Sequence, residues 1–246
     1  GAYAQAIAEA IPSGVTPVVV HGGGPQIGEA LKAAGIQSHF VGGFRVTTPE
    51  TFEVVERVLA SEVGPAVAQS LIAHGVNAVA ISGRSSGVLV AQPLTQLVDG
   101  TSADLGLVGV ITSVEPSALK ELVAAGKVPV VSPIATDAKG SQGFNVNADL
   151  AAAAIAGALD AQWLIIMTDV AGIYRNWPDK SSLISSISAV ELEEIKSTFA
   201  EGMAPKVQAC LDAIAAGAKA VRIIDGTDPS ALKGALLGEG GTLVVA

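Results

Sequence analysis

Three consecutive glycines follow a short apolar run near the start of the chain, in the segment VVVHGGGPQIG (18–28). Successive backbone N–H groups in such a turn can form a concave anion site, and the N-terminus of a following helix adds partial positive charge. The spacing matches neither of two common nucleotide-binding loops. There is no G-x-x-x-x-G-K-[ST] pattern, and Ile27 stands where the dinucleotide pattern needs a glycine after Gly24. The segment therefore predicts either a phosphate-binding turn, built on Gly23 and Gly24, or a purely structural strand-to-helix turn.

Two further polar segments lie in the first two thirds of the chain. VGGFRVTTPE (41–50) places Arg45 beside a glycine pair, and an arginine can bind a carboxylate through two parallel hydrogen bonds. FNVNADLAAAA (144–154) places Asn145, Asn147 and Asp149 at the start of an almost wholly apolar helix. Simple capping of that helix is the structural alternative for the second segment.

The last third of the chain has two more candidates. IIMTDVAGIY (165–174) ends an apolar strand with Thr168 and Asp169, where a carboxylate is costly unless it caps a helix or binds something. GMAPKV (202–207) places Lys206 in the first turn of a helix, where the helix dipole disfavours a cation. A lysine there is explained if it faces an anion, and exposure to solvent is the alternative.

The elements that must hold these residues alternate between strands and helices. Short apolar runs bounded by turn residues predict strands, and apolar residues at helical spacing predict helices. The predicted strands are 16–21, 77–82, 128–134, 163–168, 220–224 and 243–245, with hairpins between 88 and 114. Of these, 163–168 (WLIIMT) is the most hydrophobic and is expected to be the most completely buried. The predicted helices are 2–11, 25–35, 49–75, 117–126, 148–159, 205–217 and 229–237, with another beginning at the capping box of Ser188 and Glu191. Thr48 as N-cap and Pro49 at the first helical position mark the start of the helix over 49–75. This order predicts an α/β fold with a mainly parallel central sheet between layers of helices.

The composition excludes several classes of function. The net charge is −9 without any cluster of Lys or Arg, which argues against nucleic-acid binding. No apolar run is long enough to cross a bilayer, and no signal peptide is visible, so we expect a cytoplasmic protein. Cys210, the one cysteine, lies in an apolar helical pattern and is expected to be buried, and with three scattered histidines it predicts no metal site in the protein itself.

Taken together and in order, these segments resemble the acetylglutamate kinases of the amino acid kinase superfamily. The resemblance rests on VVVHGGGPQI, FVGGFRVTTPE, DLGLVG, NVNAD, TDVAGIY, NWPDKSSLIS and GMAPKV, and YRNWPDKSSLIS is similar to actinobacterial members in particular. It implies a kinase of arginine biosynthesis that moves the γ-phosphoryl group of ATP to the γ-carboxylate of N-acetyl-L-glutamate. Mg²⁺ would bridge the ATP phosphates, and the protein would form a homodimer or a higher homo-oligomer.

The resemblance also implies roles for individual residues. Residues 1–160 would form an N-terminal lobe for the acyl-amino-acid substrate and for dimerisation, and 161–246 a C-terminal lobe for the nucleotide. The amides of Gly23 and Gly24 would hold the γ-carboxylate and the transferring phosphoryl group, with β-hairpins near this substrate site. The remaining roles are substrate binding by Arg45 and Asn145, catalysis by Lys206 with Asp149 as its organiser, and nucleotide binding by Thr168, Asp169, Gly172 and Tyr174.

The sequence departs from the family pattern in a few places. The first strand of the family, with its Lys-x-Gly-Gly motif, has no match here, and the chain starts directly on a helix, so we expect that the first part of the natural protein is absent. Arg84 and Thr227 replace residues common in relatives, and the last glycine-rich loop is short. The alternatives are a related carboxylate or carbamate kinase, such as one acting on a carrier-bound aminoadipate, or an inactive relative that binds an effector. A dehydrogenase is disfavoured by the glycine spacing.

Overall fold

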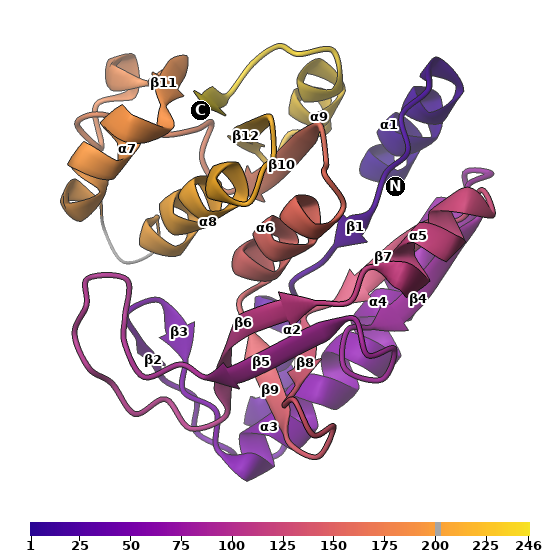
Figure 1. Ribbon diagram of the computed structural model, residues 1–246, viewed down its shortest axis with the longest axis vertical. Coiled ribbons are helices and arrows are strands. Elements are labelled where there is room, and N and C mark those ends of the chain that lie inside the picture. Colours follow the sequence, from indigo (N-terminus) through magenta and orange to yellow (C-terminus); the bar gives the residue numbers. More distant parts are fainter. Residues whose placement is uncertain (200–202) are drawn as a thin grey trace.

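The computed structural model describes residues 1–199 and 203–246 (Figure 1). Its α-helices are α1 (Ala2–Ala10), α2 (Gly24–Ala33), α3 (Pro49–Glu56), α4 (Gly64–Ile72), α5 (Ser117–Ala124), α6 (Ala148–Ala158), α7 (Ala189–Ile195), α8 (Ala204–Ala215) and α9 (Pro229–Leu236). Its strands are β1 (Val19–Val20), β2 (Phe40–Val41), β3 (Phe44–Arg45), β4 (Ala78–Ser82), β5 (Leu89–Pro93), β6 (Val108–Val114), β7 (Val128–Ser132), β8 (Ile134–Thr136), β9 (Gly143–Val146), β10 (Trp163–Thr168), β11 (Ser186–Ser188), β12 (Ala220–Asp225) and β13 (Thr242–Val245).

A parallel sheet of order β1-β7-β4 forms the core of the N-terminal part. Helices cover both of its faces, with α1 and α4 packed on one and α5 and α6 on the other. All five residues of the middle strand β7 are buried, as expected for a strand covered on both sides. The predicted α/β class with a parallel sheet between helices is confirmed.

The β-hairpins lie beside this sheet. Strands β5 and β6 pair in antiparallel fashion, as predicted for the region from 88 to 114, and close a small barrel with β8 and β9. A second hairpin, β2–β3, carries Arg45 and was not predicted as strands. Both hairpins lie in the lower part of Figure 1. The start of β6 pairs with Asn145 and Val146, and Thr47, just after β3, contacts Asn145, so both hairpins reach the segment that precedes α6.

A second sheet, of order β10-β12-β13-β11, forms the C-terminal part. One face packs on α6 and α8, which lie side by side in Figure 1, and the other packs on α1 and α9. Helix α6 touches both sheets, because Ala151 and Ile155 face the first sheet while Ala153 and Ala156 face the second. Its alanine-rich sequence follows from this position, since small side chains on every face allow close packing in two directions.

Two predictions about these elements were wrong in detail. Strand β10 was expected to be the most completely buried, but Trp163 is 48% and Met167 38% exposed, because β10 lies at one edge of its sheet. The helix expected over 49–75 is interrupted by a π-helical segment, Arg57–Val63. Pro65, just beyond it, has no N–H to donate, so regular α-helical hydrogen bonding cannot continue through this point.

Candidate active site

The glycine turn between β1 and α2 has free donors and occupied acceptors. The carbonyl of Gly22 accepts a hydrogen bond from His21 Nδ1 (2.9 Å), that of Gly23 from the N–H of Ile27 (2.8 Å), and that of Gly24 from Arg45 Nη2 (3.1 Å). Within residues 1–199 and 203–246, no acceptor is found for the N–H groups of the three glycines. Gly22 and Gly24 are exposed, so the turn offers these N–H groups to a ligand.

Packing favours glycine at position 23. A Cβ added there would lie 2.6 Å from Leu59 Cδ2 and 3.4 Å from Val63 Cγ2, so the Leu59 side chain would have to shift. Its φ of 178° is ordinary extended backbone, so the preference for glycine comes from the close approach of the π-helical segment. That segment therefore forms the wall behind the turn.

The glycine turn lies against the start of α6. A Cβ added to Gly22 would be 3.9 Å from the Cβ of Ala148. Asn147 caps α6 by accepting from the backbone N–H groups of Asp149 and Leu150, which confirms the capping interpretation for this residue. The predicted substrate-binding glycines and Asp149 thus meet in one region.

Lys206 joins this region from the C-terminal part. Its Nζ donates to Asp149 Oδ2 at 2.7 Å, and both side chains are 20% exposed. Each residue lies in the first turn of its own helix, α8 or α6. The carboxylate of Asp149 offsets the unfavourable position of a cation at a helix N-terminus. Lys206 therefore faces an anion within the protein. Gly202, the first residue of the predicted GMAPKV motif, lies outside the described residues.

Arg45 and Asn145 stand on the hairpin side of the turn. Arg45 also donates to Ser38, and its guanidinium stacks 4.5 Å from the ring centroid of Phe40. Burial lowers the pKa of Arg45, but a guanidinium remains charged at any physiological pH. Asn145 Nδ2 donates to Thr47 Oγ1 (3.1 Å), and Thr47 Oγ1 donates to the carbonyl of Arg45 (2.8 Å). This chain of contacts places Asn145 beside Arg45 and orients its amide.

The four predicted nucleotide-binding residues lie apart from this group, at the end of β10. Thr168 is buried and donates to Asp169, which is exposed. Gly172 is buried, and a Cβ there would lie 2.5 Å from Thr242 Oγ1, so close packing against β13 gives this glycine a structural reason. Tyr174 is half-buried and meets the ring of Trp177 edge-on at 5.2 Å. In the part of the chain that the structure describes, no hydrogen bond joins these four residues to Asp149 or Lys206.

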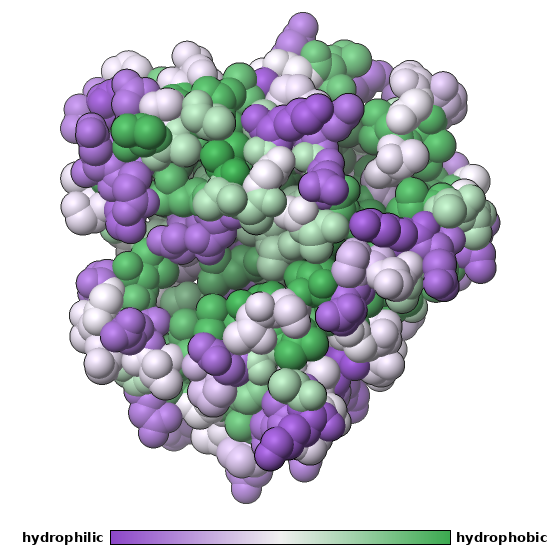
Figure 2. Space-filling model, in the orientation of Figure 1, coloured by the Kyte–Doolittle hydropathy of each residue, from purple (hydrophilic) through white to green (hydrophobic). Residues whose placement is uncertain are grey.

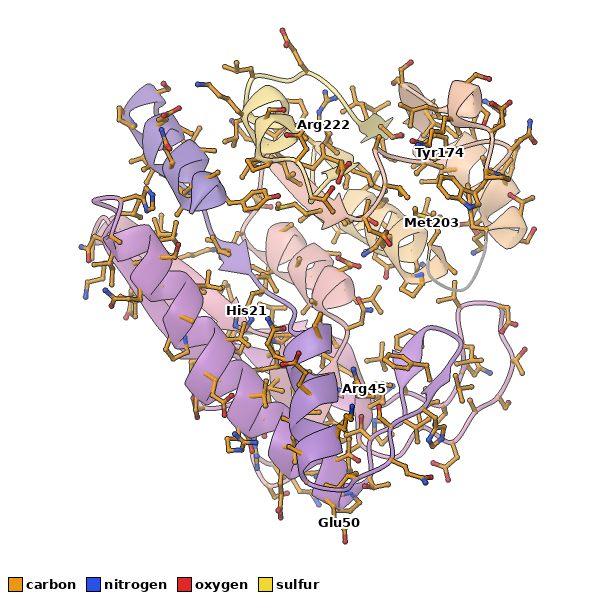
Figure 3. The ribbon with its side chains drawn as sticks, turned by 180° about the vertical axis from the view of Figure 1, so that it is seen from behind. His21, Arg45, Glu50, Tyr174, Met203 and Arg222 are labelled. Atoms are coloured by element: carbon orange, nitrogen blue, oxygen red, sulfur yellow. The ribbon has the colours of Figure 1, made fainter. Side chains whose placement is uncertain are left out.

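The surface is hollowed between the two parts of the molecule. Figure 2 shows this hollow with apolar side chains on its floor, between the start of α8 above and the β2–β3 hairpin below. In Figure 3, Tyr174 and Met203 lie on the upper, C-terminal part, while His21 and Arg45 lie on the lower, N-terminal part. The N-termini of α2, α6 and α8 therefore converge on a region that is open to solvent, an arrangement that favours an anion.

Some features of the site were missed by sequence reasoning. His21 was regarded as one of three scattered histidines, yet its ring contacts the glycine turn and Ser132. Its position immediately before the glycines was the one available signal. Cys210 was predicted correctly as buried, and desolvation raises the pKa of its thiol, with a further contribution from Asp149. A thiol in that state is unreactive.

The described residues contain neither a cluster of metal ligands nor a membrane-spanning helix. No set of three His, Cys, Asp or Glu side chains there is grouped closely enough to hold a metal ion. None of the helices in the described ranges has the length and apolar character needed to cross a bilayer.

Comparison with known proteins identifies the family of this chain. The family model of the amino acid kinase family matches residues 1–225. An acetylglutamate kinase of Nocardia farcinica is 50% identical over 233 residues, which are 94% of this chain and 77% of that protein. An acetylglutamate kinase of Corynebacterium urealyticum is 48% identical over 228 residues, 93% of this chain and 75% of that protein.

A solved structure extends the likeness to the backbone. The protein smu.665 of Streptococcus mutans is 26% identical, has a TM-score of 0.79, and the match covers 96% of this chain and 88% of that one. The predicted resemblance to actinobacterial acetylglutamate kinases is thus confirmed, and neither alternative function is favoured. This chain belongs to the amino acid kinase family and, within it, to the acetylglutamate kinases.

Proposed function

We propose that this protein transfers the γ-phosphoryl group of ATP to the γ-carboxylate of N-acetyl-L-glutamate, giving ADP and an acyl phosphate. A carboxylate oxygen attacks the γ-phosphorus while the bond to the β–γ bridging oxygen breaks, and the electron pair leaves with ADP. A carboxylate is already a nucleophile, so the reaction needs no general base. The demands on the protein are to hold two anions in line and to neutralise their charge.

The free N–H groups of Gly23 and Gly24 are assigned to the γ-carboxylate and the phosphoryl group that reaches it. Preorganised backbone donors are effective here because they need no rearrangement as charge moves. The α-carboxylate of the substrate is assigned to Arg45, which donates to the carbonyl of Gly24 from the hairpin side of the turn. Asn145 donates to Thr47, so its carbonyl oxygen can accept the acetamido N–H of the substrate.

Lys206 is assigned to the charge that develops on the phosphoryl oxygens and the leaving group, with Asp149 holding the ammonium group in place. Thr168, Asp169, Gly172 and Tyr174 are assigned to the nucleotide. Mg²⁺ would neutralise charge between the ATP phosphates, which themselves supply most of its ligands, and the exposed carboxylate of Asp169 suits the remainder. In this proposal residues 1–160 hold the acyl amino acid and pair with a second copy, and residues 161–246 hold ATP.

The observation that carries the proposal is the Lys206–Asp149 contact. It brings a cation from the C-terminal part to the start of α6, next to the glycine turn of the N-terminal part. Phosphoryl transfer between two substrates held on different parts of the protein needs a charged group at such a junction. The free N–H groups of the glycine turn lie at the same junction and add donors for an anion.

A coupled assay of ADP release by the full-length protein tests the proposal. N-acetyl-L-glutamate, glutamate, aspartate and carbamate are each offered with MgATP, with an acceptor-free reaction as the control. We expect acetylglutamate to give the highest kcat/KM, at least about 100-fold above glutamate, because glutamate lacks the acetamido group and leaves the carbonyl oxygen of Asn145 without its partner. Higher kcat/KM with carbamate, or ADP release that ignores the acceptor, would contradict the proposal.

A further inference from the structure

His21 occupies the junction between β1 and the glycine turn. Its side chain is buried, with 7% of its surface exposed, and both ring nitrogens have partners. Nδ1 lies 2.9 Å from the carbonyl oxygen of Gly22, and Nε2 lies 2.9 Å from Ser132 Oγ at the end of β7. The ring therefore links the turn to the central strand of the parallel sheet.

The contact with Gly22 fixes the tautomer. A carbonyl oxygen can only accept, so Nδ1 must carry the proton, and in the neutral ring Nε2 is an acceptor. Burial favours the neutral ring, because desolvation lowers the pKa of His21 and outweighs the opposing effect of the bond to Gly22. The single proton of Ser132 Oγ has two acceptors within reach, Nε2 and the carbonyl of Leu59. Because the Leu59 carbonyl already accepts from the N–H of Gly64, the hydroxyl can turn to Nε2 and leave neither acceptor unpaired.

Ser132 continues the link to the wall behind the turn. Its Oγ also lies 3.0 Å from the carbonyl of Leu59, in the π-helical segment Arg57–Val63. Gly64 leaves room for this cluster, since a Cβ there would lie 3.0 Å from Ser132 Oγ and 3.1 Å from His21 Nε2. The π-helical segment and the glycine that follows it thus fit around the His21–Ser132 pair.

Both ends of this link act on the turn. His21 holds the peptide carbonyl of Gly22, and the Leu59 side chain packs where Gly23 would carry a Cβ. A peptide is planar, so fixing the carbonyl of Gly22 also fixes the direction of the Gly23 N–H in the same peptide. That N–H is one of those assigned to the reacting groups.

We propose that His21 is a positioning residue for phosphoryl transfer, whose imidazole, anchored by Ser132, sets the Gly22–Gly23 peptide so that the Gly23 N–H faces the reacting phosphoryl group. The inference rests on the proposed function. It adds a role for three side chains, His21, Ser132 and Leu59, to which the resemblance assigned none. His21 makes no contact with substrate in this role and transfers no proton.

Two substitutions separate the two nitrogens of the ring. The side-chain amide nitrogen of Asn, like Nδ1 of His, is bonded to Cγ, so the side chain of His21→Asn can still donate to the Gly22 carbonyl. Gln reaches as far as Nε2, so His21→Gln can keep a bond to Ser132 and loses the one to Gly22. His74 provides the matched control, because its exposed ring makes the same type of contact, from Nδ1 to the carbonyl of Ser70 at 2.8 Å, far from the turn.

We expect His21→Gln to lower kcat about 100-fold, as for a misplacement of about 1 Å, with both KM values within about threefold of the native values. His21→Asn should keep kcat within about tenfold, and His74→Gln should match the native protein. The melting temperatures of the two His21 variants should fall by similar amounts, since each keeps one of two hydrogen bonds. A role confined to stability predicts equal kcat for the two, and that result would overturn the proposal.

A readout without turnover comes from the imidazole ¹⁵N shifts of the native protein, in which His21 should show the neutral Nδ1–H form at pH 7.5. The Nε2–H form would remove the bond to Gly22 and the proposal with it. Ser132→Ala gives a second variant if His21→Gln does not fold, with kcat expected to fall about tenfold while the Nδ1–H form persists. Native protein that releases no ADP with acetylglutamate would refute the proposed function itself, whereas equal effects of Asn and Gln in an active protein refute only this role.

Discussion

Replacing Lys206 by Met removes one charge and keeps most of the aliphatic stem. The ammonium group and Asp149 Oδ2 are 2.7 Å apart, which corresponds to a gross attraction of about 6 kcal/mol at an effective dielectric constant of about 20. Desolvation of the two groups offsets most of this attraction. Because both side chains are one-fifth exposed, the net effect on the free energy of unfolding should lie between the values for surface and buried pairs, about 2 kcal/mol. In a chain of this length that lowers Tm by about 4–8 °C.

The effect on catalysis should be much larger than the effect on stability. In the proposed role the ammonium group stabilises charge that develops only in the transition state, so Lys206→Met should lower kcat about 1,000-fold and change both KM values little. That factor corresponds to about 4 kcal/mol of transition-state stabilisation. Steady-state ADP release at saturating ATP and acetylglutamate measures kcat, and thermal unfolding in the same buffer measures Tm.

Lys233 supplies a matched control. It pairs with Glu9 at 3.1 Å on the surface, where the two side chains are 65% and 46% exposed. Lys233→Met removes the same type of side chain and should change kcat by less than about twofold and unfolding by at most about 1 kcal/mol. If Lys206→Met lowers Tm but leaves kcat within about threefold of the native value, the ion pair is structural and the catalytic role of Lys206 is wrong.

Two further predictions concern the substrate side of the site. Arg45→Ala should raise KM for acetylglutamate about 10–100-fold, the value of a lost hydrogen bond to a charged group, and leave KM for ATP within about twofold; an equal rise in both KM values in the coupled assay would contradict the assignment. The free energy of unfolding should fall as the pH drops below about 6.5. His21 then becomes protonated in the unfolded chain, whereas its lowered pKa keeps the buried ring neutral in the folded protein. Urea unfolding at pH 7.5 and 5.5 measures this loss, which should be smaller in His21→Asn; equal losses in both proteins would show that His21 titrates normally in the folded state.

The sequence allowed good prediction of the elements that depend on local chemistry. The capping box of Ser188 and Glu191 begins α7 as expected, and Thr48 with Pro49 begins α3. These signals involve residues a few positions apart, so they can be recognised without knowledge of the fold. The ends of most helices and strands agree with prediction for the same reason.

Features that depend on strand order could not be predicted in this way. The apolar run Trp163–Thr168 indicates a strand, but only the sheet shows that it lies at an edge and exposes Trp163. Strand β7, whose residues include Pro129, is instead buried at every residue, because it is the middle strand of its sheet. The π-helical segment likewise depends on tertiary packing, because Gly64, which follows it, lies against Ser132 and His21 from other elements.

The candidate site falls between these cases. Each polar cluster could be recognised locally, because it follows a glycine turn or starts a helix. For Asn147, however, helix capping was an alternative to ligand binding, and capping is what the structure shows. Only the order of the motifs, through the family resemblance, suggested that Lys206 would meet Asp149 across 57 positions of sequence. Spacing alone carries no information on such a contact, because it depends on how two sheets share α6.

The pairing of Lys206 with Asp149 also explains how an acidic protein can bind two anions. A net charge of −9 gives no general attraction for ATP or an acyl glutamate, so the attraction must be local. The converging starts of α2, α6 and α8 supply partial positive charges that need no counterion, and Arg45 adds a full one. An unpaired lysine at the start of α8 would be repelled by its own helix and would spread over many rotamers. Asp149 holds the ammonium group of Lys206 in one position, although its carboxylate neutralises part of the positive charge. In the proposed function a phosphate bound at the three helix starts adds negative charge beside this pair. The ammonium group can then interact with that phosphate without moving.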